Sequence, residues 1–241
     1  MDLFGGIGLV TKAILRVGFG ARLWDLAAGP QYDVAKPANL KGILRAIRRG
    51  EILGVMLATP CTSWSLARDR TNVIRTSEFP WGNPTPPKPL SDNDRKSLEA
   101  GNQTMRATLK IVRACMKHRI PWCFENPATS RCFRTQEWQD IIAARNVFEV
   151  VVDQCAYGAR WKKATKLIFG NVDSQDLERF RFKRCGNGKL CEFSKKPHIV
   201  LTGSDPTGIP WTRRAQAYPP RFAAALAKVL VAPARDKRNL C

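Results

Sequence analysis

The chain has 241 residues, and 44% of them are hydrophobic, which suits one large domain with its own core. No run of about 18 consecutive apolar residues occurs, so the sequence predicts no membrane span. The 40 Lys and Arg residues outnumber the 20 Asp and Glu residues, for a formal net charge of +20. This excess favours a polyanionic partner, with nucleic acid the first choice over a membrane surface or an acidic protein.

The eight cysteines are scattered along the chain, whereas small secreted scaffolds concentrate theirs. The start "MDLFGGIGLV" lacks the basic region and cleavage pattern of a signal peptide. We therefore expect free thiols in a reducing, intracellular compartment, which would be the nucleus in a eukaryote. The charge is uneven, because residues 156–241 hold 18 Lys and Arg against 6 Asp and Glu.

Short apolar runs alternate with amphipathic stretches along the first two thirds of the chain. The runs predict strands at residues 3–4, 21–25, 51–60, 120–125, 146–155 and 163–171, the last two paired with each other. Helical spacing of apolar residues predicts helices at 9–19, 39–50, 95–119, 135–145 and 219–231. A long loop rich in Pro and Arg covers residues 62–93.

This alternation predicts an α/β fold with a doubly wound, mostly parallel, Rossmann-like sheet. We expect a core at residues 1–170, a small, basic, irregular segment at 171–212 that faces the target, and a C-terminal helix at 213–241 that returns to the core. Ligands of such sheets bind outside the carboxyl ends of the strands. The stretch from Asp2 to Gly8, and also Asp25, Cys61 and Glu125, all fall at or just after predicted strand ends.

The stretch "DLFGGIG" at residues 2–8 places glycines between a strand and a helix. Such a turn lets the backbone approach a ligand closely and presents helix N-terminal amides. Its spacing differs from the G-x-G-x-x-G of dinucleotide folds, and a tight turn without a ligand would look similar. Asp25, at the end of the second strand, is the natural carboxylate for the ribose of a nucleoside-containing cofactor.

Cys61 follows a proline in "LATPCTSWS", at the end of an apolar strand. Most cysteines are buried structural residues, but this position faces the expected ligand edge and has basic residues downstream. A Cys–His protease pair is disfavoured, because His118 ends a helix. Glu125 in "FENP" is either a capping carboxylate or a general acid that Asn126 orients.

In this order, "DLFGGIG", "TPCTSWS" and "FENP" resemble the cofactor-binding, Pro-Cys and Glu-Asn motifs of the cytosine-C5 DNA methyltransferases. "DQCAYGARWKKATKLIFG" resembles the family's later basic motif, and "TRRAQAYPPRFAAALAKVL" resembles the motif before its closing helix. The resemblance runs in order through residues 2–231. Other features are similar to a short, divergent branch found with mobile elements of protists and viruses.

The resemblance implies a class I methyltransferase that uses S-adenosylmethionine and methylates cytosine in DNA. Cys61 would attack C6 of a flipped-out cytosine while Glu125, with Asn126 beside it, acts at N3. In the later motif, Lys162, Ala164 and Lys166 fall in the frame of the family's Gln-x-Arg-x-Arg pattern, so Lys166 is a further catalytic candidate. The implied cofactor-binding residues are Asp2, Phe4, Gly5, Gly6, Gly8, Asp25, Asp33 and Pro60.

Basic residues near these motifs are expected to contact nucleic acid. The candidates are Ser65, Arg68, Arg70, Arg160, Lys162 and Lys163. The loop after Cys61, with Arg68, Arg70, Arg75 and Trp81, is expected to close over the base. Two alternatives stay open: methylation of RNA, and a catalytically inactive nucleic-acid-binding domain. The segment before "TRRAQAYP" is short, so another chain or domain could supply sequence specificity.

Cys185, Cys191 and His198 have a C-x5-C-x6-H spacing and offer three ligands for a structural zinc ion. A fourth ligand is missing locally, and Cys132, Cys155 or Cys241 could supply it. The alternative is that these cysteines are free thiols in a basic loop.

Overall fold

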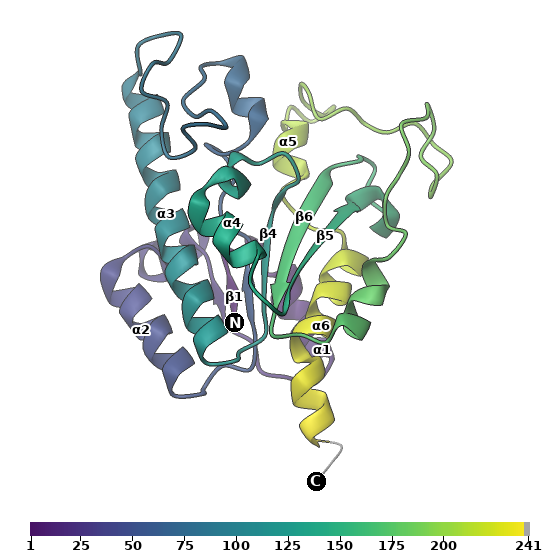
Figure 1. Ribbon diagram of the computed structural model, residues 1–241. Coiled ribbons are helices and arrows are strands. Elements are labelled where there is room, and N and C mark those ends of the chain that lie inside the picture. Colours follow the sequence, from purple (N-terminus) through teal and green to yellow (C-terminus); the bar gives the residue numbers. More distant parts are fainter. Residues whose placement is uncertain (239–241) are drawn as a thin grey trace.

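The computed structural model describes residues 1–238, folded around a six-stranded mixed sheet (Figure 1). The strand order is β2-β1-β3-β4-β6-β5. The strands are β1 (Asp2–Leu3), β2 (Leu23–Trp24), β3 (Val55–Leu57), β4 (Trp122–Pro127), β5 (Val147–Asp153) and β6 (Ala164–Gly170). The first four strands in this order, β2, β1, β3 and β4, are parallel to one another. Strand β6 runs antiparallel to both β4 and β5.

The fold is therefore α/β, as predicted, and the sheet is mixed: the pairings β2–β1, β1–β3 and β3–β4 are parallel, whereas β4–β6 and β6–β5 are antiparallel. The connection between β5 and β6 covers only residues 154–163. A parallel crossover needs about a dozen residues or more, so these two strands pair antiparallel. The predicted pairing of the strands at 146–155 and 163–171 is confirmed. Several strands are shorter than predicted, and the fourth extends past Glu125 to Pro127.

Helices cover both faces of the sheet (Figure 1). One face carries α2 (Pro37–Arg48), α3 (Asp92–Lys117) and α4 (Gln136–Ile142), and the other carries α1 (Leu9–Arg16) and α6 (Pro220–Arg238). Side chains alternate along each strand, so Trp122 and Phe124 pack under α3 and α4 while Cys123 packs under α6. Within residues 1–238, no helix has both the length and the apolar character needed to cross a bilayer.

Two long segments rise above the sheet, one after β3 and one beside the end of β5 (Figure 1). The first, residues 58–91, leads into α3, which begins with a capping box between Ser91 and Asp94. The second, residues 181–210, forms no helix and only one isolated β-bridge, from Ser204 to Pro210. A short helix, α5 (Trp211–Arg214), then leads the chain back to α6.

Candidate active site

The carboxyl ends of β1, β3 and β4 lie side by side, because Leu3, Leu57 and Phe124 are in register across the three strands. This register gathers the glycine turn after β1, Cys61 after β3 and Glu125 on β4 at one edge of the sheet. The sequence predicted this convergence from the strand ends alone.

The glycine turn takes a left-handed backbone at three positions, with φ of 59° at Phe4, 55° at Gly6 and 68° at Gly8. A side chain at Gly6 would meet no atom within 4 Å, so this side of the turn is open. Asp25 accepts hydrogen bonds from the amides of Gly6 and Ala27, both at 2.8 Å. Asp25, directly after β2, is therefore held against the glycine turn, where the sequence predicts a cofactor.

Asp2 is buried below this turn. Its Oδ2 accepts hydrogen bonds from the amide of Thr11 at 3.0 Å and from its hydroxyl at 2.8 Å, whereas Oδ1 is buried without a partner among residues 1–238. Burial raises the pKa of the Asp2 carboxyl. Gly5 packs directly on it, since a Cβ there would lie 2.6 Å from the carboxyl carbon. Asp2 thus supports the turn from beneath.

Cys61 is half-buried, and within the described residues it forms no disulfide. Its carbonyl accepts hydrogen bonds from the amides of Trp64 and Ser65, so the chain turns directly after the thiol. Burial raises the pKa of the Cys61 thiol, Lys163 lowers it and Glu125 raises it further. A cation and a carboxylate therefore both act on this sulfur.

Glu125 is only 6% exposed, so its polar carboxyl group is buried in the protein. The hydroxyl of Tyr218 donates to its Oε2 at 2.9 Å. Oε1 is buried and has no hydrogen-bond partner in the described part of the chain. A buried carboxylate oxygen without a partner costs free energy, so it marks a position where a ligand group would bind.

Asn126 connects the ends of β3 and β4. Its side-chain amide donates to the carbonyl of Thr59 at 2.9 Å and to that of Glu125 at 3.0 Å. Thr59 in turn shares a 2.6 Å hydrogen bond with Thr108 of α3. Asn126 therefore fixes the backbone two residues before Cys61, a positioning role that differs from the predicted one of orienting the Glu125 side chain.

Lys166, predicted to belong to the catalytic group, lies apart from Cys61 and Glu125 in this structure. Its ammonium pairs with Glu149 at 2.8 Å and lies 4.7 Å from the ring centre of Phe133, on the face covered by α4. Side chains alternate along β6, so Lys166 points away from the face that holds Glu125 and Tyr218. Lys163 acts on Cys61 in its place, and its ammonium is held by the carbonyl of Ala215 at 3.0 Å.

The loop after Cys61 is fastened to α3 and is not a free lid. Arg68, predicted to contact nucleic acid, is almost buried in an ion pair with Asp94. Arg75 is fully buried, lies 3.6 Å from the ring centre of Trp64 and donates to the carbonyls of Ser63, Pro80 and Leu98. Both arginines are committed to internal contacts: Arg68 to a carboxylate, and Arg75 to backbone carbonyls that would otherwise be buried without a donor.

The remaining predicted residues are more dispersed. Arg70 and Arg160 are exposed, and Ser65 caps the 3-10 helix Leu66–Arg70. Asp33 accepts from the amide of Ala35 in the turn before α2. Lys162 donates to the carbonyl of Gly186 at 3.0 Å and to the side chain of Asn187 at 2.8 Å. Pro60 lies three residues after the end of β3, directly before the thiol.

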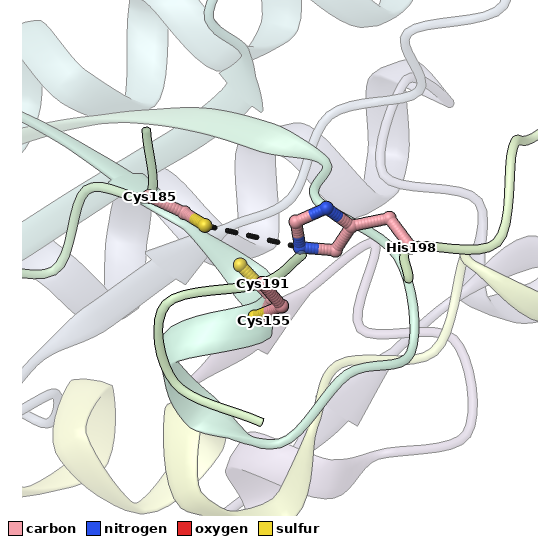
Figure 2. Close-up of side chains that lie close together, drawn as sticks. All are labelled: Cys155, Cys185, Cys191 and His198. Carbon is pink, nitrogen blue, oxygen red and sulfur yellow. Dashed lines mark hydrogen bonds between the residues drawn. The ribbon is translucent and has the colours of Figure 1, made fainter. Parts of the chain in front are cut away.

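A second cluster lies at the start of the irregular segment. The side chains of Cys155, Cys185, Cys191 and His198 point toward one another, and their ligand atoms all lie within 4.8 Å (Figure 2). These four residues could hold a metal ion. Cys155 is the fourth member, whereas Cys132 is buried in the main core and Cys241 lies outside the described residues.

Tyr218 was not singled out in the sequence. It lies in "AQAYPPRF", directly before the prolines that begin α6, and the only signal was the motif around it. Neither the protein-family models nor the curated proteins compared with this chain give a match. A thiol can add to a ring as a nucleophile, and a cation or a carboxyl group that donates a proton can stabilise the negative charge that then develops.

Proposed function

We propose that this protein is an S-adenosylmethionine-dependent methyltransferase that acts on C5 of cytosine in DNA. The observation that carries the proposal is the pairing of Cys61 with a buried Glu125 whose Oε2 is held by Tyr218 and whose Oε1 is free. Cys61 and Glu125 suit a ring that sulfur attacks at one atom and that accepts a hydrogen bond at another atom. Cytosine has both atoms, C6 and N3, on one heterocycle.

The Cys61 thiol loses its proton before it attacks, and Lys163 favours the resulting thiolate, whereas burial and Glu125 disfavour it. Its sulfur forms a bond to C6, and the electron pair of the C5–C6 double bond moves into the ring toward N3. When the base is bound, the Glu125 carboxylate takes up a proton from solvent and donates it to N3, which neutralises that charge. C5 thereby becomes nucleophilic, which it is not in free cytosine.

The glycine turn is the proposed site of S-adenosylmethionine. Its open side at Gly6 and the adjacent Asp25 carboxylate suit a nucleoside with a ribose diol. When bound, S-adenosylmethionine supplies an electrophilic methyl group at C5. The C5 proton then leaves to solvent, the C5–C6 double bond re-forms as the C6–sulfur bond breaks to return the Cys61 thiolate, and N3 gives its proton back to Glu125.

A nucleic acid is favoured as the partner by the net charge of +20 and by the exposed basic side chains beside the site. DNA is the first candidate because it is the substrate of the family that the motifs resemble. Backbone charge would serve RNA equally, so RNA is the second candidate substrate. An inactive binding domain is the third reading. It leaves unexplained why Glu125 is buried with a free oxygen next to a thiol.

An oligonucleotide that carries 5-fluorocytosine tests the proposal directly. Fluorine at C5 blocks loss of the C5 substituent, so an active enzyme stays covalently attached through Cys61. We expect an adduct on a denaturing gel that requires S-adenosylmethionine and is lost in Cys61→Ala. Cys132→Ala is the matched control, because that thiol lies in the main core. Parallel reactions with duplex DNA, single-stranded DNA and structured RNA identify the substrate. A folded protein that binds nucleic acid but forms no adduct on any of them would contradict the proposal.

A further inference from the structure

We propose that Cys155, Cys185, Cys191 and His198 bind one structural zinc ion. All four ligand atoms lie within 4.8 Å of one another, and the side chains converge on a common point (Figure 2). Three thiolates and one imidazole make a ligand set typical of structural zinc sites, with no position left for a substrate. The metal assignment does not depend on the proposed methyl transfer.

The distances suit a tetrahedral ion. Zn–S bonds of about 2.3 Å and a Zn–N bond of about 2.0–2.1 Å at a tetrahedral angle place sulfur and nitrogen about 3.6 Å apart. The Sγ of Cys185 lies 3.9 Å from the Nε2 of His198. Small side-chain rotations would therefore complete the geometry.

The segment around the cluster has no hydrophobic core that could hold it. Within residues 181–210, all of which the structure describes, the only buried side chains are those of Cys185 and Cys191. Phe182 and Phe193, by contrast, are 81% and 40% exposed. A segment that buries only thiols needs a cross-link, and a metal ion supplies one.

The backbone around the thiols is arranged as a metal-binding turn requires. The amide of Glu192 points at the Sγ of Cys185 at 3.5 Å, which suits a thiolate that accepts an N–H donor. Two backbone hydrogen bonds of 2.8 Å close a turn after Cys191, from Lys195 to the Cys191 carbonyl and from Cys191 to the Lys196 carbonyl. The turn brings both sulfurs to the same side of the segment.

The fourth ligand joins this segment to the catalytic sheet. Cys155 lies in the 3-10 helix Gln154–Tyr157, directly after β5. The neighbouring Asp153 accepts from the amide of Cys185 at 2.8 Å, and the amide of Gln154 donates to the carbonyl of Lys163 at 3.3 Å. A metal at Cys155 would therefore hold residues 184–199 against the start of β6, where Lys163 acts on Cys61.

The zinc-held segment also displays a basic surface. Residues 181–200 contain one acidic residue, Glu192, and six basic ones: Arg181, Lys183, Arg184, Lys189, Lys195 and Lys196. Exposed aromatic side chains among cations are typical of nucleic-acid-binding surfaces. We expect the metal to order this surface for nucleic acid, a consequence that rests on the proposed function, whereas the metal site itself does not.

Metal analysis of the purified full-length chain, without cofactor or nucleic acid, tests the site. We expect one zinc per chain, and in the cobalt-substituted protein the intense visible bands of a tetrahedral ion together with thiolate-to-cobalt charge transfer. His198→Asn should lose the metal, whereas His198→Cys should retain it with an altered cobalt spectrum. His118→Asn, at the only other histidine, and Cys61→Ser should both keep full metal content.

Limited proteolysis gives a second readout that does not require the variants to be fully stable. Removing zinc from the native chain with a chelator should expose Lys189, Lys195 and Lys196 to trypsin, and adding zinc back should restore protection. A chain that stays metal-free after reconstitution with zinc, or that keeps its zinc in the Cys185→Ser, His198→Asn double variant, would overturn the assignment. A metal-loaded chain without methyl transfer would leave the zinc site standing and count against the proposed function alone.

Discussion

The hydroxyl of Tyr218 donates to Oε2 of Glu125 at 2.9 Å, across 93 positions of sequence. This contact leaves only Oε1 of the carboxylate available to a ligand, and it joins the segment before α6 to the end of β4. The pKa of Tyr218 is raised well above its ordinary value, first by burial and then by Glu125, so the hydroxyl keeps its proton and stays a donor.

Tyr218→Phe should lower kcat for methyl transfer while leaving the fold intact. Hydrogen bonds to charged groups contribute about 1.5–3 kcal/mol, which corresponds to a loss of about 10- to 100-fold in rate. The loss should be the same at every pH from 6 to 10, roughly the range over which the tyrosine stays protonated. Tyr157→Phe is the matched control, because that hydroxyl is buried without a partner in the described residues. Equal losses in the two variants would argue against the Glu125 contact.

Lys163→Met should raise the pKa of Cys61, because it removes the cation that lowers it. Glu125→Gln should lower the same pKa, because it removes a negative charge that disfavours the thiolate. The rate of iodoacetamide modification at the Cys61 peptide, followed by mass spectrometry across pH, reports both shifts. We expect the pH midpoint of the modification rate to rise in Lys163→Met and to fall in Glu125→Gln. In Lys163→Arg it should stay close to its original value. Shifts in the opposite directions would contradict this electrostatic arrangement.

Lys166→Met should retain methyl transfer within about twofold, since exposed ion pairs such as Lys166–Glu149 contribute little. Lys163→Met, three positions earlier, should lose most activity at neutral pH. Each variant removes one positive charge, from directly before β6 or from within it, so the comparison isolates the position of the charge. If Lys166→Met were the inactive variant, the orientation of β6 described above would be wrong.

Asn126→Ala should reduce both activity and stability, because the buried carbonyl of Thr59 loses its donor. We expect urea unfolding to show a loss of about 1–3 kcal/mol. Asn171→Gly is the control for stability alone. It removes amide contacts to the carbonyls of Cys115 and Ile120, far from the thiol, and suits the left-handed backbone at φ 56°. Activity should fall in the first variant and persist in the second at temperatures where both are folded.

Arg75→Lys should destabilise the loop between β3 and α3 although the charge is kept. A lysine cannot reproduce the planar stacking on Trp64 together with several carbonyl contacts. We expect a loss of about 2–4 kcal/mol in unfolding free energy and faster tryptic cleavage within residues 62–91. Arg70→Lys, at an exposed position of the same loop, should change neither measurement.

Local sequence patterns predicted much of the fold. The apolar runs and the helical spacing predicted each strand and each major helix, and the short connection at 154–163 already indicated a paired β5 and β6. Strand ends were predicted less well, because pairing partners decide where a strand stops: β4 continues to Pro127 only because β6 offers Thr165 opposite it. The interruption of the parallel order by β6 likewise depends on long-range pairing.

The sequence by itself determined that a glycine turn, a thiol and a carboxylate follow strands that end at one edge, because residues at the ends of parallel neighbours must meet. Only the tertiary structure decided which groups complete the site. Lys163, directly before β6, lowers the pKa of Cys61, whereas Lys166 within β6 pairs with Glu149 on the opposite face from Glu125. Tyr218 reaches Glu125, and Cys155 joins the thiol cluster, through packing between residues far apart in the chain, which no local pattern encodes.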